Sequence, residues 1–361
     1  MTTFLLLCAG LIALVAGAEC LVRGAAKIAS SWGISSLVIG LTVVAFGTSA
    51  PELAVSVASS AAGQADIALG NVVGSNNFNV LLILGLSALI VPLIVDQRLV
   101  RLDVPLMIAA SIAVYLMGLD GLVSRAEGGC LFVGLLSYTL WCLKVARQES
   151  AAIVEEYREA FEGEEEVSDS VHKRNLWLDV GFVLVGLLLL VLGADWLVDG
   201  ATRLARQMKI SELVIGLTIV AGGTSLPELA TSLVAAVRGE RDIAVGNVVG
   251  SNLFNLLGVL GLSALISPTG VHVAEQAVRF DIPVMIAVSV ACLPIFASGH
   301  RIARWEGALF VGYQIAYIAT LVMLDTKSPA LAIFSQQMWW FVLPLTAVTL
   351  LVMSWRTFVK R

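Results

Sequence analysis

Charged residues are scarce in this chain of 361 residues, of which Lys, Arg, Asp and Glu make up only 14%. Soluble domains carry about 25%, so this composition, with a mean hydropathy of +0.91, excludes an ordinary soluble protein. Histidine occurs three times, and the five cysteines show no CxxC or other paired spacing. We therefore expect the cysteines to pack as small apolar residues and expect neither a zinc site nor a disulfide framework.

Signatures of catalysis are missing as well. The sequence contains no HExxH, GxSxG or comparable pairing of nucleophile and base, which argues against a membrane hydrolase. We expect no enzymatic activity and no cofactor. The net charge of −5 does not suggest nucleic acid, because the charge of the loops beside a membrane matters more than the total. The expected partner is the lipid bilayer, with no obligate protein partner.

Long apolar runs fill the chain instead. A run of about 20 predominantly apolar residues is enough to cross a hydrocarbon core of roughly 30 Å. The first run has no basic segment before it and no clear cleavage site, so we read it as a span rather than as a signal peptide. The runs lie near residues 3–22, 35–60, 66–91, 102–119, 127–147, 176–198, 211–237, 242–267, 280–298, 304–324 and 337–355.

The order of these runs is five, a polar linker, five and one more, which predicts an all-α polytopic membrane protein. The linker reads EEYREAFEGEEEVSDSVHKRN at its centre, and a run of like charge usually stays solvated. A regulatory Ca²⁺ site there would need carboxylates fixed around one ion, and nothing in the sequence fixes them. The predicted segments are a first five-helix repeat at 1–147, an acidic cytoplasmic linker at 148–175, a second five-helix repeat at 176–327 and an extra transmembrane helix at 336–356.

The distribution of Lys and Arg gives an orientation. If the N-terminus lies outside, sixteen of the 22 basic residues fall on the inner side, which places the linker and the C-terminus in the cytoplasm. Five spans are an odd number, so the second repeat crosses in the opposite sense and the two repeats are inverted. Inverted repeats with binding sites on broken helices are the architecture of many secondary transporters. We expect an integral protein of a prokaryotic plasma (inner) membrane.

One stretch of the sequence occurs twice. Residues 40–79 read GLTVVAFGTSAPELAVSVASSAAGQADIALGNVVGSNNFN, and residues 216–255 read GLTIVAGGTSLPELATSLVAAVRGERDIAVGNVVGSNLFN. A single GTSxPE would also fit a Pro-kinked helix, and a single GNVVGSN would fit close packing of small residues. Recurrence of both at a constant offset of 176 residues, with Glu in each, favours a functional site, because a carboxylate at this depth costs about 3 kcal/mol.

The polar residues of the two copies form a set of oxygen ligands. Proline breaks the helix in each copy, and a break frees backbone carbonyls. Oxygen atoms alone, with two carboxylates and no imidazole or thiolate, suit hard cations such as Ca²⁺ and Na⁺. The candidate ligands are the carboxylates of Glu52 and Glu228, the hydroxyls of Thr48, Ser49, Ser75, Thr224, Ser225 and Ser251, the amides of Asn79 and Asn255, and the carbonyls of Ala45, Thr48, Ala221 and Thr224.

Other matched pairs are given structural roles. Asp66 and Asp242 precede helical sequence and are expected to be N-caps. Glu19 and its counterpart Asp195 are expected to pair with a basic residue or to face the interior, and not to bind ions. Asn71 and Asn247 are expected to support the ligands rather than to contact the ions.

With these residues in view, the two copies resemble the alpha-repeats of the cation/Ca²⁺ exchanger superfamily, whose members include the sodium/calcium exchangers. The resemblance implies two inverted five-helix halves, a core of the second, third, seventh and eighth helices, and a first and sixth helix that slide across it. It also implies that Glu52 and Glu228 bind Ca²⁺ with the carbonyls of Thr48 and Thr224. The serines and the carbonyls of Ala45 and Ala221 fall on the family's Na⁺ positions. Asn255 replaces the Asp of K⁺-dependent members, which favours K⁺-independent transport.

The resemblance implies exchange of Na⁺ for Ca²⁺ by competition at one site, the cage formed by the oxygen ligands of both repeats. One Ca²⁺ neutralises both glutamates, whereas several Na⁺ do so only by sharing the same oxygens. If the two ions carry unequal total charge in one cycle, the exchange is electrogenic. Ca²⁺/H⁺ antiport stays open, because a desolvated carboxylate takes up a proton more readily than an exposed one. A cation channel is a third reading, although two pseudosymmetric halves do not form the usual ring of subunits. The eleventh span departs from the family's ten helices.

Overall fold

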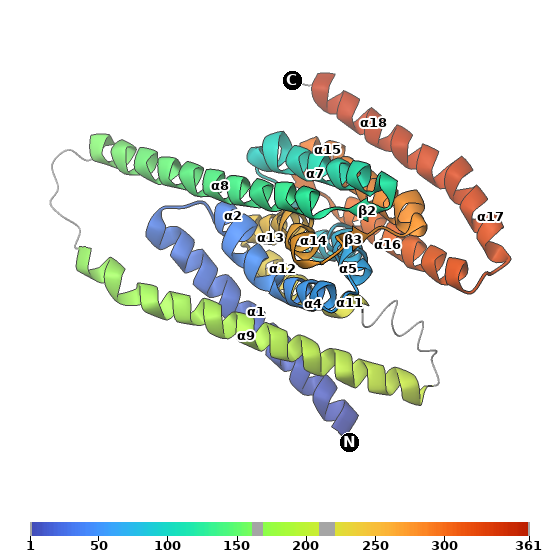
Figure 1. The fold of residues 1–361 in the computed structure, drawn as a ribbon. Coiled ribbons are helices and arrows are strands. Elements are labelled where there is room, and N and C mark those ends of the chain that lie inside the picture. The colour runs from blue at the N-terminus through green and yellow to red at the C-terminus, as the bar shows by residue number, and fades with distance from the viewer. Residues whose placement is uncertain (1, 161–168, 209–220, 360–361) are drawn as a thin grey trace.

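The computed structural model describes residues 2–160, 169–208 and 221–359, and the chain in these ranges is almost entirely helical (Figure 1). Nine of its helices are long and apolar enough to cross a membrane. A bent pair of helices, Ser36–Thr48 and Ala50–Ala61, forms a further span broken by 46°. Ten of the eleven predicted spans thus have a counterpart among the described residues. The run at 211–237 stays a prediction, because it begins outside them.

The first half of the chain contains the elements that run from the N-terminus to the linker. These are α1 (Thr2–Trp32), α2 (Ser36–Ile39), η1 (Gly40–Val44), α3 (Ala45–Thr48), α4 (Ala50–Ala61), α5 (Asp66–Phe78), η2 (Asn79–Leu84), α6 (Gly85–Ile90), β1 (Leu93–Ile94), η3 (Leu99–Asp103), α7 (Val104–Met117), η4 (Gly118–Asp120), β2 (Leu122–Val123) and α8 (Arg125–Ala160).

The second half repeats this order. Its elements are α9 (Asp169–Gln207), α11 (Ala221–Gly223), α12 (Leu226–Arg238), α13 (Arg241–Phe254), η6 (Asn255–Val259), α14 (Leu260–Ile266), β3 (Val271–His272), η7 (Ala277–Asp281), α15 (Ile282–Ala297), β4 (Arg301–Ile302) and α16 (Arg304–Asp325), followed by α17 (Ala330–Gln337), η8 (Met338–Val342) and α18 (Leu343–Val359). Residues 148–160 continue α8 and residues 169–175 begin α9, so the predicted linker is helical at both ends.

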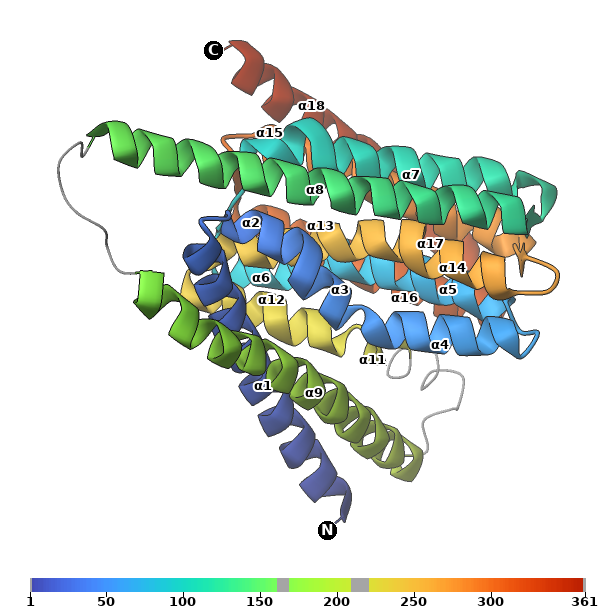
Figure 2. The ribbon, with the colours of Figure 1, turned by 60° about the vertical axis from the view of Figure 1, so that its left-hand side comes forward.

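Two spans lie at the centre of the molecule. The span Arg241–Ile266 buries 83% of its apolar window and the span Asp66–Ile90 buries 67%, whereas no other span among the described residues exceeds 39%. Figure 2 shows α4, α5, α12 and α13 running side by side between α7 and α8 on one side and α1 and α9 on the other. The two copies of the repeated stretch therefore form the core, as the sequence predicts.

Two short antiparallel strand pairs join the halves. Strand β1 pairs with β4, with Leu93 opposite Ile302, and β2 pairs with β3, with Leu122 opposite His272. Each pair is extended by one backbone hydrogen bond of 2.9 Å, from Val95 N to the His300 carbonyl and from Val273 N to the Gly121 carbonyl. Because each pair takes one strand from each half, the connections of one half are tied to those of the other.

Helices α1 and α9 pack against each other through glycines spaced seven residues apart. A β-carbon at Gly17 would lie 2.8 Å from the carbonyl oxygen of Gly186, and one at Gly186 would lie 2.6 Å from the backbone nitrogen of Leu21. The backbones are thus in direct contact, as small residues allow in membranes. The same close approach recurs at Gly10, Gly24, Gly193 and Gly200. Figure 2 shows the pair crossing the central helices obliquely.

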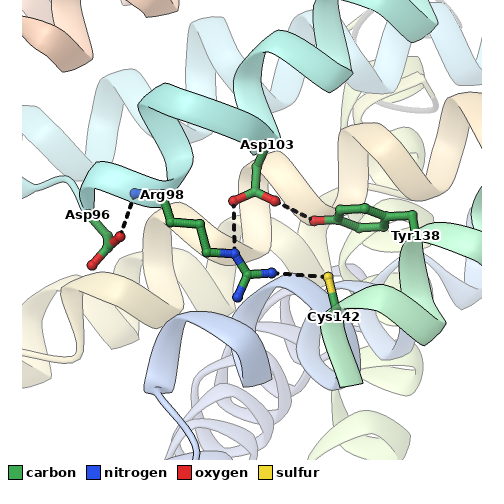
Figure 3. A network of polar contacts seen from close by, with 5 residues as sticks. All are labelled: Asp96, Arg98, Asp103, Tyr138 and Cys142. Carbon is green, nitrogen blue, oxygen red and sulfur yellow. Dashed lines mark hydrogen bonds and ion pairs between the residues drawn. The ribbon is translucent and has the colours of Figure 1, made fainter. Parts of the chain in front are cut away.

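A polar network fastens α8 to the beginning of α7 (Figure 3). The hydroxyl of Tyr138 donates to Asp103 Oδ1 at 2.9 Å, and Arg98 Nε lies 3.5 Å from Asp103 Oδ2. A second guanidinium nitrogen of Arg98 lies 3.2 Å from Cys142 Sγ, and the guanidinium stacks over the ring of Trp141 at 4.8 Å. The buried carboxylate is thereby paired and hydrogen-bonded, as burial of a charge requires.

Some structural roles assigned from the sequence need correction. Asp66 and Asp242 are not N-caps, because the cap positions are Ala65 and Glu240 and neither cap has a side-chain hydrogen bond. The aspartates lie in the first turn, where a negative charge still interacts favourably with the helix dipole. The prediction for Glu19 is confirmed, since Arg238 Nε donates to Glu19 Oε2 at 3.0 Å and Arg23 also pairs with it. Asp195 is exposed.

Candidate functional site

The two Pro-containing motifs break their helices in the same way. Ser49 separates α3 from α4 with φ −85° and ψ 9°, and Ser225 precedes α12 with φ −90° and ψ 8°. Pro51 and Pro227 occupy the first turn of the helices that follow, where the missing N–H of proline does not interrupt a hydrogen-bond ladder. The predicted helix break is confirmed, and it places an N-terminal turn of α4 and of α12 in the centre of the core.

Each glutamate of the motifs lies in one of these first turns. Glu52 and Glu228 are fully buried, at 0% exposure. Ser225 Oγ donates to Glu52 Oε1 at 2.9 Å, and Ser49 Oγ donates to Glu228 Oε1 at 2.8 Å. Each carboxylate is therefore held by the serine of the opposite repeat, beside a helix N-terminus that favours negative charge. The two repeats thus contribute to a single site.

The threonines and the asparagines Asn71 and Asn247 form a supporting layer. Thr48 Oγ1 donates to Asn247 Oδ1 at 3.0 Å, and Asn247 Nδ2 donates to the backbone carbonyl of Glu228 at 3.4 Å and to Ser232 Oγ at 3.0 Å. The other repeat has the same pattern, in which Asn71 links Thr224, the Glu52 carbonyl and Ser56. These asparagines bond to the glutamate backbones and not to their carboxylates, which agrees with the supporting role expected of them.

The serines of the second motif differ between the repeats. Ser75 Oγ donates to Glu52 Oε1 at 3.5 Å and lies 3.1 Å from Ser225 Oγ. Ser251 Oγ is buried and has no hydrogen-bond partner among the described residues. Both serines lie one turn before the asparagines that begin η2 and η6, namely Asn79 and Asn255.

The candidate carbonyl ligands are less completely described. The Ala45 carbonyl accepts a hydrogen bond of 3.0 Å from Ser49 N, and Thr48 Oγ1 lies 3.4 Å away from it. The helix break therefore leaves this carbonyl with its helical hydrogen bond, contrary to the expectation that the break frees it. Ala221 begins α11, directly after residues outside the described ranges. Coordination by these carbonyls stays a prediction.

Several buried oxygens of the site lack a donor. The second carboxylate oxygens, Glu52 Oε2 and Glu228 Oε2, and the amide oxygens of Asn79 and Asn255 have no hydrogen-bond partner within the described residues. A buried acceptor without a partner costs about 1–3 kcal/mol, and more when it is charged. A cation bound among these oxygens would remove that penalty. Oxygen ligands of this kind fit Ca²⁺ and Na⁺, and the described residues hold no cluster of three or more His, Cys, Asp or Glu.

Four further residues belong to this site and were not among the sequence candidates. They are Ser56 and Ser232, which accept hydrogen bonds from Asn71 and Asn247, and Asn76 and Asn252, which bond to the amides of Asn255 and Asn79. Both pairs obey the same offset of 176 residues. A residue-by-residue comparison of the repeats for polar identities would have found them.

Comparisons with known proteins give one consistent result. The family model described as "Sodium/calcium exchanger protein" matches residues 2–144 and 178–323. "Inner membrane protein YrbG" of Escherichia coli (strain K12) is 38% identical over 330 residues, which cover 89% of this chain and 97% of YrbG. "Putative antiporter CaxA" of Alkalimonas amylolytica is 39% identical over 84% of this chain and 95% of CaxA.

A solved structure extends the comparison to three dimensions. The structure of the sodium-calcium exchanger NCX_Mj superposes with a TM-score of 0.74 at 33% identity. The superposition covers 89% of this chain and 99% of the other. Both the repeated core and the surrounding helices are therefore shared, whereas α17, η8 and α18 lie beyond the last residue matched by the family model.

Proposed function

This chain belongs to the sodium/calcium exchanger family of membrane antiporters, and from that premise we propose that it exchanges Na⁺ for Ca²⁺ by alternating access. The observation that carries the proposal is the pair of fully buried glutamates, each held by the serine of the opposite repeat and each with one unpartnered carboxylate oxygen. Two negative charges in a water-poor core need cations, and the surrounding groups offer only oxygen. Ca²⁺ and Na⁺ are the substrates in this proposal, which includes no cofactor and no obligate protein partner.

The candidate residues have separate roles in this proposal. Glu52 and Glu228 bind Ca²⁺ through their carboxylates, together with the carbonyls of Thr48 and Thr224. The hydroxyls of Ser49, Ser75, Ser225 and Ser251, the amides of Asn79 and Asn255, and the carbonyls of Ala45 and Ala221 complete the shells of Na⁺. The Ser49 and Ser225 hydroxyls already bond to the glutamates, so they sit where an ion can share the same oxygen.

Competition for these oxygens couples the two ions. A cage with two uncompensated charges is costly to move through a low-dielectric barrier, so only ion-loaded states cross. One Ca²⁺ cancels the charge of both glutamates. Three Na⁺ would exceed it by one, which makes the cycle electrogenic and sensitive to membrane potential at about 2.3 kcal/mol per charge per 100 mV. Because position 255 carries a neutral amide, we propose that K⁺ is not required.

The placement in the membrane follows the sequence and one relative. YrbG is named an inner membrane protein, which supports the same location here. The excess of Lys and Arg supports an external N-terminus, with the linker at 148–175 and the C-terminus in the cytoplasm. We retain the division into repeats at 1–147 and 176–327 and an extra helix at 336–356, and we propose a transporter without enzymatic activity.

Ca²⁺/H⁺ antiport is the second candidate function. The observation in its favour is that Glu52 and Glu228 are the only carboxylates among the polar residues of the cage, and both are fully buried. A buried carboxylate releases a proton when a divalent cation binds. Protons could then replace Na⁺ as the counter-ions without any change in the arrangement of the site.

The experiment that separates these functions is ⁴⁵Ca²⁺ uptake into proteoliposomes that contain the purified chain. Vesicles loaded with Na⁺ are compared with vesicles loaded with choline at equal pH, and then with choline vesicles that carry an imposed pH gradient. Uptake that requires internal Na⁺ and responds to a K⁺-diffusion potential is the expected result. Uptake driven by the pH gradient alone would establish Ca²⁺/H⁺ antiport instead, and uptake that needs neither gradient would indicate a channel.

A further inference from the structure

Four asparagines form a layer beside the glutamates at the centre of the core. Asn76 and Asn79 lie one helical turn apart where α5 passes into η2, and Asn252 and Asn255 lie in the same relation where α13 passes into η6. Their side chains are buried to 2% exposure or less. Asn79 and Asn255, called here the ligand asparagines, are candidate ion ligands, whereas Asn76 and Asn252, called here the outer asparagines, bond to them and are not themselves candidate ligands.

The hydrogen bonds of this layer cross from one repeat to the other. Asn79 Nδ2 donates to Asn252 Oδ1 at 3.0 Å, and Asn255 Nδ2 donates to Asn76 Oδ1 at 3.1 Å. Asn76 and Asn252 also donate to each other's backbone carbonyls, at 3.3 and 3.5 Å. Each repeat therefore supplies one outer asparagine and one ligand asparagine to two matching amide pairs.

Two methionines complete the partners of the outer asparagines. Asn252 Nδ2 lies 3.5 Å from Met107 Sδ on α7, and Asn76 Nδ2 lies 3.7 Å from Met285 Sδ on α15. Both ends of the Asn76 and Asn252 amides are therefore engaged. The nitrogen is directed at a backbone carbonyl and a sulfur, and the oxygen accepts a hydrogen bond from the ligand asparagine. Their amides are thus fixed in one orientation.

This fixed orientation determines which end of the ligand asparagines is free. An amide has a donor end and an acceptor end. Because the donor ends of Asn79 and Asn255 are bound to oxygens of the outer pair, their oxygens are left without a hydrogen-bond partner in the described part of the chain. If a ligand amide were flipped, its oxygen would face the oxygen of the outer asparagine. Its N–H groups would then point toward the ions, and a cation would repel them.

We propose that Asn76 and Asn252 are positioning residues that hold the amides of Asn255 and Asn79 with their oxygens toward the transported ions. This inference rests on the proposed exchange function. Several Na⁺ need more oxygen ligands than one Ca²⁺ in the same cage, and Na⁺ has less charge with which to attract the glutamates. The outer asparagines therefore control the apparent affinity for Na⁺ more strongly than that for Ca²⁺.

The test uses double-mutant cycles with two readouts. The first readout is the Na⁺ and Ca²⁺ concentration for half-maximal exchange in proteoliposomes, and the second is thermal stabilisation of the purified protein by each ion, since a ligand stabilises the state that binds it. Asn252→Ala and Asn76→Ala are expected to raise the half-saturating Na⁺ concentration about three- to tenfold, the range for one lost hydrogen bond. The half-saturating Ca²⁺ concentration is expected to rise less.

The pairing of the residues provides the decisive comparison. Asn252→Ala is expected to have no further effect once Asn79 is Ala, and Asn76→Ala none once Asn255 is Ala, because the group to be positioned is gone. Asn76→Ala combined with Asn79→Ala, a pair from one repeat without a mutual hydrogen bond, is expected to show multiplied effects. Asn77→Leu is the matched control, because it copies Leu253 at the equivalent position and is expected to leave both affinities unchanged.

Asn252→Asp and Asn76→Asp test the same idea if the alanine variants fail to fold. Aspartate loses the donor end of Asn, but it presents an oxygen to the ligand amide in either orientation. Its negative charge also attracts cations, so the half-saturating Na⁺ concentration should not rise. Asp variants as impaired as Ala variants, or additive effects within the hydrogen-bonded pairs, would overturn the positioning role while Na⁺/Ca²⁺ exchange stands. Wild-type protein that is stabilised by neither ion and shows no exchange would overturn the proposed function together with this inference.

Discussion

At each glutamate of the core, one carboxylate oxygen is held by a serine and the other is left for an ion. Glutamine keeps the acceptor for the serine but removes the charge, so Glu52→Gln and Glu228→Gln should fold and lose exchange. We expect Ca²⁺ uptake in Na⁺-loaded vesicles to fall to the level of empty vesicles for either variant.

A buried glutamate outside the cage serves as the control for this prediction. Glu306 is 1% exposed and accepts a hydrogen bond of 2.6 Å from the backbone nitrogen of Ala303 at the start of α16. Glutamine can accept that bond equally well, so Glu306→Gln should transport as the wild-type chain does. Uptake at the wild-type rate by either cage variant would show that the ions bind elsewhere.

Position 255 decides how many negative charges the cage contains. Asn255→Asp adds a third carboxylate and removes the donor to Asn76 Oδ1, so neutralising the cage requires one more positive charge. We expect a changed dependence of uptake on Na⁺, or a new requirement for K⁺, measured as initial rates against Na⁺ concentration with and without K⁺. Asn79→Asp is the equivalent change in the other repeat. Ion dependence that stays the same in Asn255→Asp would remove Asn255 from the ion shell.

At the scale of elements, the sequence predicts what each repeat contains but not how the two repeats meet. The offset of 176 residues identifies Glu52, Glu228 and their neighbours because identical local chemistry recurs. It contains no information that Ser49 reaches Glu228 rather than Glu52, since that contact depends on how α4 and α12 cross. The break at Ser49 was predictable because proline acts locally. The helical hydrogen bond retained by the Ala45 carbonyl was not, because it depends on where within the turn the break falls.

The packing of α1 against α9 shows the same limit. Glycines at positions 10, 17 and 24 and at positions 186, 193 and 200 are visible in the sequence, yet the pattern alone does not say which helix each one contacts. A β-carbon at Gly186 would meet backbone atoms of α1, which cannot move aside as a side chain can. Overpacking of this kind costs about 1–3 kcal/mol.

We therefore expect Gly186→Ala to lower the thermal stability of the purified protein, measured as the temperature of half-maximal unfolding in detergent. Gly181→Ala is the control on the same helix, because a β-carbon there meets no atom within 4 Å. Alanine favours a helix over glycine by about 1 kcal/mol, so Gly181→Ala should be neutral or stabilising. Equal stability of the Gly186→Ala and Gly181→Ala proteins would show that α1 and α9 do not approach so closely in the membrane.

At the scale of the whole molecule, the inverted repeats are alike in the core and differ at the periphery. Tyr317 donates to Asp281 at 2.9 Å, as Tyr138 does to Asp103, but the position equivalent to Arg98 is occupied by Gln276. Arg238 bonds to Glu19, whereas the position equivalent to Arg238 in the first repeat is Ala62. The ion cage requires matching residues from both repeats, whereas these peripheral contacts do not.

The final helical segment, α17 to α18, is the largest such peripheral difference. None of the apolar window of Ala330–Val352 is buried, and the family model ends at residue 323. Its polar contact with the preceding helix α16 is a hydrogen bond of 2.6 Å between Tyr313 and Thr346. No residue of the cage bonds to this segment within the described ranges. In Figure 1 it runs along the edge of the molecule away from α1 and α9.

Ending the chain after residue 329 should therefore preserve exchange. The ten spans predicted for the rest of the chain retain both glutamates, both amide pairs and the α1–α9 contact. The new surface of α15 and α16 can be covered by lipid, which is as apolar as the side chains removed. We expect Na⁺-dependent Ca²⁺ uptake and half-saturating concentrations close to those of the full chain, with Tyr313→Phe in the full chain as the control for the lost hydrogen bond. A truncated protein that is monodisperse in detergent yet cannot exchange would make the final helix part of the transport cycle.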